Sequence, residues 1–309
     1  MQRNKPSLIA IVGPTATGKT ACAVALAKRI AGEVISADSM QVYQGMDIGS
    51  AKPTLKERQG VPHHLIDILP PEAPYSAGQF AKQALQAIDM VQKNGHMPIL
   101  AGGTGFYVHA VLYPLDFAGT PVNHALRAEL QALAKEDPQA LWQRLEREAP
   151  DAAARLHPND VHRVIRALEL AQGGARSGDA FRSMQMRMPT CLFGLTMPRE
   201  TLYARINARV EAMMQAGLLE ETRHVYALAG VTRQSTSMQG LGYRQLLDYI
   251  EGRCTLDTAV DRIKMETRRF AKRQLTWFRR QEGIHWLDMT CFADADAAAE
   301  AMQDILSKE

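Results

Sequence analysis

A glycine-rich segment of eight residues, GPTATGKT at positions 13–20, constrains the fold more than any other part of the sequence. It matches the pattern G-x-x-x-x-G-K-[ST], in which backbone N–H groups cradle phosphates. The apolar run SLIAIV precedes it, and an alanine-rich stretch typical of a helix follows. Because this motif requires a strand before it and a helix after it, the segment predicts a phosphate-binding loop (P-loop) at the end of a buried strand.

The residue types in this loop suit phosphate chemistry. Two glycines allow the backbone to curl around an anion, and the helix that begins near Lys19 adds its positive dipole end. Lys19 can reach phosphate oxygens, and the Thr20 hydroxyl is suited to ligate a magnesium ion that bridges them. The predicted phosphate-binding residues are Gly13, Pro14, Thr15, Ala16, Thr17, Gly18, Lys19 and Thr20.

Composition sets broad limits on the chain. With 309 residues, 46% of them hydrophobic, it can form one large domain or two. No apolar run approaches the roughly 18 residues of a membrane span. The N-terminal residues lead directly into the first predicted strand, which favours a cytoplasmic protein. The four cysteines are scattered without C-x-x-C spacing, so neither a disulfide framework nor a zinc site is indicated.

Strand and helix patterns alternate through the first 113 residues. EVISADS, HHLIDIL and MPILAGG predict further strands, and residues 76–95 predict a helix with Ser76 and Gln79 as a capping box. Such alternation is typical of an α/β fold with a parallel, doubly wound sheet, which binds ligands at the carboxyl ends of its strands. We therefore predict a P-loop NTPase-like α/β core over residues 1–118.

The pattern changes near residue 118. Residues 119–190 show helical periodicity interrupted by prolines and end in a glycine-rich, charged loop, so we predict a helical insertion domain there. TCLFGLTM then predicts a return to the sheet, and residues 191–309 continue as a mainly helical region. Within it, the segment 262–280 carries eight Lys or Arg residues and one acid, Glu266. Such a helix is either a solvated face whose Arg stems cover the core or a contact surface for nucleic-acid phosphates.

An acid after the second predicted strand is a candidate for catalysis. Asp38 lies at that strand's carboxyl end, within reach of the P-loop, whereas the PILAGG strand ends without an acid. A carboxylate in this place is suited to act as general base for an incoming nucleophile; alternatively, it only caps a turn. The nucleophile could equally be a hydroxyl that attacks a γ-phosphate, so a small-molecule or nucleotide kinase that binds ATP stays open.

Seven ordered segments, between about residues 8 and 290, carry a resemblance to a known family. They are GPTATGKT, DSMQVYQGMDIGSAKP, VPHHLIDI, GGTGFY, HPNDVHRVIRALE, GLGYRQ and AKRQLTWFR. Together they resemble the bacterial tRNA dimethylallyltransferases, also called tRNA isopentenyltransferases. The resemblance implies transfer of a dimethylallyl group from its diphosphate to the exocyclic amine of the adenine 3′ of the anticodon.

The resemblance also implies roles for individual residues. The loop of residues 13–20 becomes the diphosphate-binding segment, with Mg²⁺ at Thr20 as cofactor, and Asp38 becomes the general base. Thr104 lies at the reaction channel, and Arg209 reaches the diphosphate. Taken without the resemblance, Thr104 is equally a hydroxyl that caps a helix, and Arg209 a surface residue.

The expected macromolecular partner is tRNA, through its anticodon stem-loop. Taken alone, the segments that would contact it are as easily an ordinary helix face or turn, and a non-enzymatic RNA-binding protein stays open as a third reading. No membrane partner is expected, and we expect a monomer. The predicted tRNA-binding residues are Asp38, Ser39, Met40, Gln41, Thr104, His162, Arg163, Val164, Ile165, Arg166, Gln239, Gly240, Leu241, Gly242, Tyr243 and Arg244.

Overall fold

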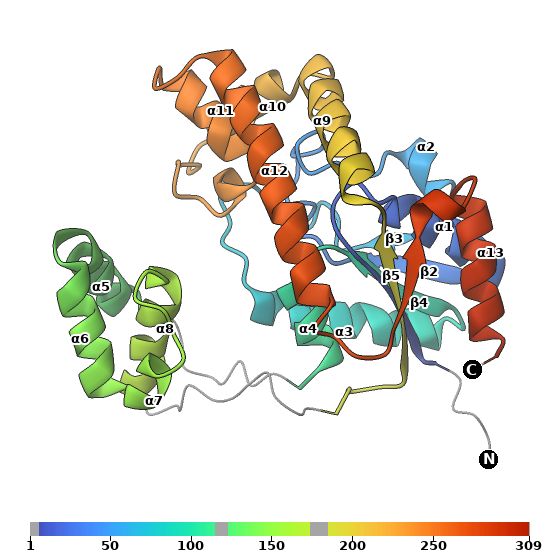
Figure 1. The fold of residues 1–309 in the computed structure, drawn as a ribbon, viewed down its shortest axis with the longest axis horizontal. Coiled ribbons are helices and arrows are strands. Elements are labelled where there is room, and N and C mark those ends of the chain that lie inside the picture. Colours follow the sequence, from blue (N-terminus) through green and yellow to red (C-terminus); the bar gives the residue numbers. More distant parts are fainter. Residues whose placement is uncertain (1–5, 115–122, 174–184, 309) are drawn as a thin grey trace. The chain divides into compact units, whose positions relative to one another are not determined.

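The chain divides into two compact units. The computed structural model describes residues 6–114, 123–173 and 185–308 (Figure 1). Unit 1 comprises residues 1–113 and 186–309, and unit 2 comprises residues 114–185. The sequence places these boundaries at residues 118/119 and 190/191, about five residues further along the chain at each end.

A six-stranded parallel sheet forms the centre of unit 1, in the order β3-β2-β4-β1-β5-β6. In the register of the central strands, Ile11 of β1 lies opposite Ala101 of β4 and Phe193 of β5. β1 thus lies between two strands from distant parts of the chain, as in a doubly wound sheet. The predicted fold class, a P-loop-type α/β core, is confirmed. The strands are β1 Leu8–Val12, β2 Gly32–Ser36, β3 His63–His64, β4 Met97–Gly102, β5 Thr190–Thr196 and β6 Ile284–Asp288.

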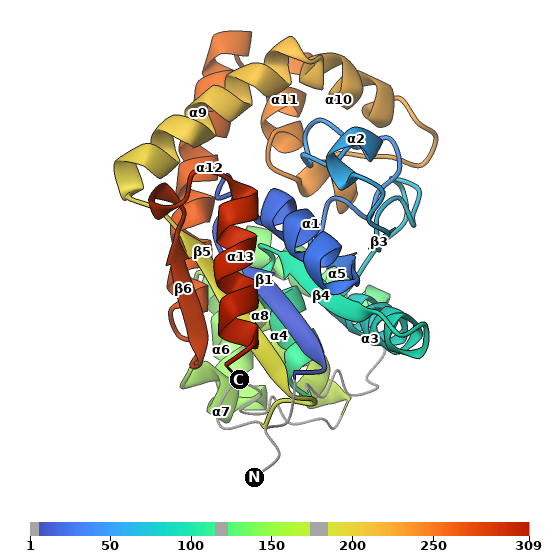
Figure 2. The same cartoon turned by 90° about the vertical axis from the view of Figure 1, so that its right-hand side faces the viewer.

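Two hydrophobic cores lie on opposite faces of this sheet. Alternate residues of β1 enter each core. Ile9 and Ile11 pack with α1 and with the last helix, α13 (Ala295–Leu306). Leu8, Ala10 and Val12 pack with α3, α4 and the helices between β5 and β6. Figure 2 shows α1 and α13 side by side on one face of the sheet. Because both faces are covered, the central strand β1, LIAIV, is apolar and buried throughout, as expected for a parallel sheet. The helices that follow the first strands are α1 Lys19–Ile30, α2 Leu55–Arg58, α3 Ala77–Lys93 and α4 Gly105–Leu112.

The predicted capping box of α3 is present. The Ser76 hydroxyl accepts a hydrogen bond from the backbone N–H of Gln79, and the Gln79 side chain accepts one from the backbone N–H of Ser76. The third predicted strand is wrong over most of its length, because β3 contains only His63 and His64. Leu65 and Asp67 then adopt left-handed backbone angles, with φ of 62° and 56°. These angles turn the chain out of the sheet.

The C-terminal part of unit 1 is helical. Its two longest helices, α9 and α12, lie side by side and antiparallel: Arg268 Nη1 donates to Asn207 Oδ1 at 2.6 Å, and Lys264 Nζ lies 2.8 Å from Glu211 Oε1. No helix of the described residues is both long and apolar enough to cross a membrane. The helices are α9 Arg199–Gln215, α10 Leu218–Tyr226, α11 Tyr243–Ile250, α12 Leu256–Phe278 and α13 Ala295–Leu306, with 3₁₀ turns at Ser237–Gln239 and Met289–Cys291.

Unit 2 has a small hydrophobic core of its own, built from leucines of α5 and α6 and the apolar face of α8. Pro138 and Pro150 occupy first turns of helices, where the missing N–H has no intrahelical partner to lose. The side chain of Glu169 is buried and bonds two guanidinium nitrogens of Arg127 at 2.7 Å, while Arg166 lies 3.1 Å away. The helices are α5 His124–Glu136, α6 Pro138–Glu148, α7 Pro150–Ala153 and α8 Val161–Gln172.

Candidate active site

The predicted P-loop connects β1 to α1 at the carboxyl edge of the sheet. Gly13 and Gly18 have φ of 138° and 92°, a region that side chains disfavour. A Cβ on Gly13 would lie only 2.4 Å from the carbonyl oxygen of Leu195 in β5, so a larger residue cannot fit there. The Thr17 hydroxyl donates to the Pro14 carbonyl at 2.8 Å and closes the loop on itself. The sequence thus fixes a tight loop at the N-terminus of α1.

Lys19 is a half-buried cation in this loop, and its ammonium donates to the Pro14 carbonyl at 2.7 Å. Burial, and then the neighbouring charge of Arg209, lower the pKa of Lys19 to about 8, while Asp38 acts in the opposite direction. A depressed lysine pKa means that the surroundings do not fully compensate the positive charge. An anion bound in the loop would supply that compensation.

Asp38 follows β2 by two residues and faces the same positive groups. Its Oδ1 accepts hydrogen bonds from the backbone N–H groups of Met40 at 2.8 Å and Gln41 at 3.4 Å, which fixes the carboxylate. No hydrogen bond to Oδ2 occurs within residues 6–114, 123–173 and 185–308. Asp38 therefore caps a turn with one oxygen and has the other available to a ligand.

Thr104 occupies the N-cap position of α4, but its side chain does not cap that helix. Its hydroxyl instead accepts a hydrogen bond from the backbone N–H of Ser39 at 3.3 Å. This contact requires a close approach of two turns: a Cβ on Gly102 would lie 2.2 Å from the carbonyl oxygen of Ala37. The GGTG sequence therefore brings the end of β4 against the turn that carries Asp38.

Arg209 projects from α9 and is half-buried. Burial lowers its pKa, whereas the charges of Asp38 and Glu57 oppose that shift. Lys19, Arg209 and Asp38 thus interact electrostatically, although they come from three separate parts of the chain. Two cations and one carboxylate leave a net positive charge, which favours an anionic ligand.

Asp38 and Arg209 line one cavity of about 300 Å³, a size in the range of small-molecule sites, whereas Lys19 is not among its lining residues. It lies within unit 1, beside the carboxyl ends of the strands and beneath α9 and α12, whose places Figure 2 shows. Apolar side chains of these two helices, Ile206, Val210 and Phe270 among them, form one wall. The predicted residues that it brings together are Thr15, Ala16, Asp38, Ser39, Met40, Thr104, Arg209, Gln239, Gly240, Leu241, Gly242 and Arg244.

Two of the predicted tRNA-binding residues are buried in roles that do not fit direct base contact. Gln41 accepts from the Ser36 hydroxyl at 2.8 Å, and its amide nitrogen lies 3.3 Å from the Ala51 carbonyl. Tyr243 has no exposed surface, and its hydroxyl donates to Glu221 at 2.6 Å. The Tyr243 ring faces the protein interior, so in this structure it is not available to a tRNA base.

The predicted contacts of residues 162–166 all lie in unit 2. Val164 and Ile165 are buried in its core, so their side chains support α8 instead of facing a ligand. Arg163 lies 3.4 Å from Asp160, and His162 is exposed. Only the polar members of this segment are accessible from outside unit 2.

Gln274 of α12 was not among the predicted site residues, although it is buried beside the P-loop. Its Oε1 accepts the backbone N–H of Thr15 at 2.9 Å, and its Nε2 donates to the Gly103 carbonyl at 2.8 Å. It thereby joins α12 to the P-loop and to the end of β4. The one signal in the sequence was a polar residue on the face of α12 that also carries Ala271 and Phe278, both buried.

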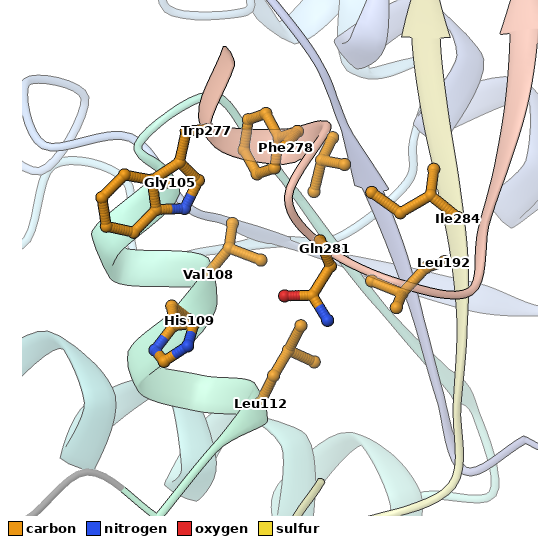
Figure 3. Close-up of a pocket in the computed structure, with 10 residues that line it drawn as sticks. Gly105, Val108, His109, Leu112, Leu192, Trp277, Phe278, Gln281 and Ile284 are labelled. Atoms are coloured by element: carbon orange, nitrogen blue, oxygen red, sulfur yellow. The ribbon is translucent and has the colours of Figure 1, made fainter. Parts of the chain in front are cut away.

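The end of α12 is held by apolar packing as well. Trp277 lies against Gly105 of α4, where an added Cβ would be 2.4 Å from the indole ring, and Figure 3 shows the two residues side by side. The small cavity below them has a volume of about 10 Å³, roughly enough for one water molecule. It is too small for a substrate, so the larger cavity is the candidate active site.

The first turn of α1, next to the P-loop, offers one oxygen ligand that fits a magnesium ion. The Thr20 hydroxyl makes no hydrogen bond within the part of the chain that the structure describes. Magnesium binds through oxygen ligands and usually takes few of them from the protein, the rest being phosphate oxygens and water. One hydroxyl beside a phosphate-binding loop is such a donor set, whereas no cluster of three His, Cys, Asp or Glu side chains occurs among the described residues.

A family model described as IPP transferase matches residues 41–281. The chain belongs to the IPP transferase family. The tRNA dimethylallyltransferase of Pelotomaculum thermopropionicum is 44% identical over 302 residues, covering 97% of this chain and 96% of that protein. That of an Exiguobacterium species is 48% identical over 287 residues, covering 92% and 91%. The resemblance predicted from sequence motifs is confirmed.

Solved structures of the IPP transferase family have the same fold. A tRNA isopentenylpyrophosphate transferase from Bacillus halodurans matches with a TM-score of 0.74 and 43% identity, over 97% of this chain and 95% of that one. A eukaryotic dimethylallyltransferase acting on tRNA matches with a TM-score of 0.82 and 28% identity, over 98% and 80%.

Proposed function

We propose that this chain transfers a dimethylallyl group from dimethylallyl diphosphate to the exocyclic amine of an adenine in tRNA, the residue 3′ of the anticodon. The observation that carries the proposal is the large cavity, which Thr15 and Ala16 of the P-loop line together with Asp38, Thr104 and Arg209. Family membership supports tRNA as the substrate, since the relatives are named for it.

The P-loop would hold the donor's diphosphate as a leaving group. As the bond between the diphosphate oxygen and the C1 carbon breaks, its electron pair and negative charge pass to the diphosphate. Lys19 and Arg209, whose pKa values are lowered by burial, gain compensation at that moment, and interactions that strengthen in the transition state lower the barrier. Magnesium held by Thr20 would share the neutralisation of this charge.

Asp38 would act on the nucleophile. The exocyclic amine of adenine is a weak nucleophile because its lone pair is delocalised into the ring. A new bond forms from the amine nitrogen to C1, and one amine proton passes to the free oxygen of Asp38. General-base catalysis of this kind contributes about a hundred- to ten-thousand-fold. Thr104 accepts a hydrogen bond from the Ser39 backbone N–H. This contact would keep the turn that carries Asp38 beside the reacting atoms.

The apolar wall of the cavity suits the hydrocarbon part of the donor. Ile206 and Val210 lie one turn apart on α9, on either side of Arg209, so one helix offers both a cation and an apolar surface. Their burial against a prenyl chain would exclude water from the breaking bond.

Incubation of the protein with dimethylallyl diphosphate, magnesium and unmodified tRNA, without ATP, tests the activity. We expect the tRNA to gain the mass of one dimethylallyl group, on the adenine next to the anticodon, by mass spectrometry of its nucleosides. An unchanged tRNA, together with ATP consumption in the presence of a hydroxyl acceptor, would instead identify a kinase.

Replacement of Asp38 tests the mechanism. We expect Asp38→Asn to lower turnover by about a hundred- to ten-thousand-fold while tRNA binding, measured by filter retention, stays near that of the wild type. The matched control is Asp89→Asn, an exposed acid on α3, which should leave turnover unchanged. Near-normal turnover of Asp38→Asn would exclude Asp38 as the base.

A further inference from the structure

Glu221, on α10, lies beside the proposed site and receives an unusual set of hydrogen bonds. Its carboxylate accepts from three successive backbone N–H groups, those of Asp47 at 2.8 Å, Ile48 at 2.7 Å and Gly49 at 2.9 Å. It also accepts from the Tyr243 hydroxyl at 2.6 Å. Successive N–H groups that converge on one anion form a nest, and here the anion is part of the protein.

These bonds connect three segments that are distant in the sequence. Residues 47–49 belong to the loop after β2, Glu221 belongs to α10, and Tyr243 begins α11. The contact is also close-packed, because a Cβ on Gly49 would lie 2.5 Å from the Tyr243 ring. Only glycine at this position allows the loop to lie on that ring.

Two backbone walls of the large cavity adjoin this contact. One wall is residues 49–51, which begin at Gly49, the last of the three Glu221-bound N–H groups. The other wall is residues 240–242, which directly precede Tyr243. Gly240 packs against Met40 of the Asp38 turn, where an added Cβ would lie 2.7 Å from the Met40 sulfur. The distance between the two walls therefore depends on the hydrogen bonds that Glu221 accepts from residues 47–49 and from Tyr243.

The P-loop end of the cavity is held by different residues. Gln274 joins Thr15 to Gly103 there, and no hydrogen bond connects Glu221 with the P-loop among the described residues. A change at Glu221 is therefore expected to move the walls of residues 49–51 and 240–242 and to leave the diphosphate-binding loop in place.

We infer that Glu221 is a positioning residue that sets the opening through which the acceptor nucleobase enters the cavity. The inference rests on the proposed function, because it assigns that opening to the unstacked adenine. Since an extruded base must fit between its pocket walls after a costly unstacking, a shift of either wall reduces productive insertion more than it reduces binding of the tRNA backbone.

Glu221→Gln tests the inference, because it keeps the side chain's size but turns one acceptor oxygen into a donor that faces N–H groups. We expect kcat/KM for tRNA to fall about tenfold or more, as the removal of a charge-assisted hydrogen bond implies, while the Kd for inorganic pyrophosphate, measured by calorimetry, stays within about twofold of wild type. Glu220→Gln, at the exposed neighbouring acid of α10, is the matched control.

Base insertion can be observed without turnover. An anticodon stem-loop with 2-aminopurine at the target position should brighten on binding the wild type and Glu220→Gln, and clearly less with Glu221→Gln. Equal brightening, or a parallel loss of pyrophosphate affinity, would overturn the inference. Tyr243→Phe, which removes only the hydroxyl, decides the question if Glu221→Gln does not fold: the same selective loss is expected there. A wild-type protein that modifies no tRNA would instead overturn the proposed function.

Discussion

Buried charged groups have opposite surroundings at the two ends of the parallel strands, here called the amino edge and the carboxyl edge of the sheet. At the amino edge, the buried Glu33 of β2 bonds His64 Nε2 at 2.6 Å and His96 Nδ1 at 2.5 Å. Burial alone would raise the pKa of Glu33, but these two histidines outweigh it and the pKa is lowered. At the carboxyl edge, burial lowers the pKa of both Lys19 and Arg209.

The difference indicates which edge is built for a ligand. A charge whose partners are all within the protein gains from its neighbours and stabilises the fold. A buried cation whose pKa is depressed costs stability, and it becomes favourable only when an anion arrives. The buried charge at the amino edge is therefore paired within the protein and serves the fold. The buried positive charge at the carboxyl edge would be neutralised by a bound diphosphate.

In the comparison of the two edges, the largest expected effect comes from removing a cation at the carboxyl edge. We expect Lys19→Met to lower kcat/KM for dimethylallyl diphosphate by about a hundred- to a thousandfold, the usual loss when one group that stabilises developing negative charge is removed. Steady-state kinetics measures it. Lys28→Met is the matched control at the other end of α1, where the lysine donates to the exposed Gln59 side chain and to no other described residue.

The pH dependence of ligand binding sharpens this prediction. Because the pKa of Lys19 is about 8 in the free protein, Lys19 is charged below that pH and loses its proton above it. The affinity of the wild type for pyrophosphate should therefore fall by about fivefold between pH 8 and pH 9, because the charged fraction of Lys19 falls from about one half to about one eleventh, and the affinity of Lys19→Met should not show this fall. An equal pH dependence in both proteins would show that another group carries the charge.

The next effect concerns the stability of the amino edge. Glu33→Gln loses at least one charge-assisted hydrogen bond to a histidine, so we expect the free energy of unfolding at pH 7 to fall by about 2 kcal/mol. The lowered pKa of Glu33 implies that this contribution is fully present above pH 4.5, the ordinary value, and is lost as the pH falls through the lowered one. Urea denaturation of both proteins at pH 7, and again at a pH below the lowered pKa of Glu33, measures this difference in stability.

A surface acid provides the control for that experiment. Glu300→Gln removes an exposed carboxylate that lies 3.7 Å from Arg29, and exposed pairs contribute about 0–1 kcal/mol. If Glu33→Gln were no more destabilising than Glu300→Gln, or if it impaired turnover without a loss of stability, the assignment of the amino edge as a structural contact would be wrong.

The parts of the site that the sequence predicts depend on local geometry. Gly13, Gly18 and Lys19 belong to one loop, which the preceding strand and the following helix make recognisable from the sequence, although Leu195 and Gln274 also contact it. The same holds for Ser76 and Gln79, whose capping bonds span three residues. The strand predicted after His64 is wrong because the left-handed angles of Leu65 and Asp67 leave no trace in an apolar pattern.

The parts that the sequence does not predict depend on partners far along the chain. The partners of Gln274 lie 259 and 171 residues away, so no local pattern indicates its role. Tyr243 is an aromatic residue of the kind that stacks on RNA bases. Its hydroxyl, however, donates a hydrogen bond to the carboxylate of Glu221, 22 residues earlier, so the ring is held inside the protein. Motif order identified the family, and side-chain packing decided which motif residues face the cavity.

The exposed face of α12 is a third region of positive charge, with the smallest expected effect per residue. Arg269 and Arg273 are exposed there, and neither forms an ion pair with a described residue; Arg273 also lines the large cavity. We expect the double replacement Arg269→Ala with Arg273→Ala to reduce the slope of log affinity for tRNA against log salt by about 1 for each phosphate that is no longer neutralised. Lys82→Ala with Lys93→Ala on α3 removes the same charge elsewhere and should leave the slope unchanged. Equal slopes for the two double variants would return the α12 arginines to the role of a solvated helix face.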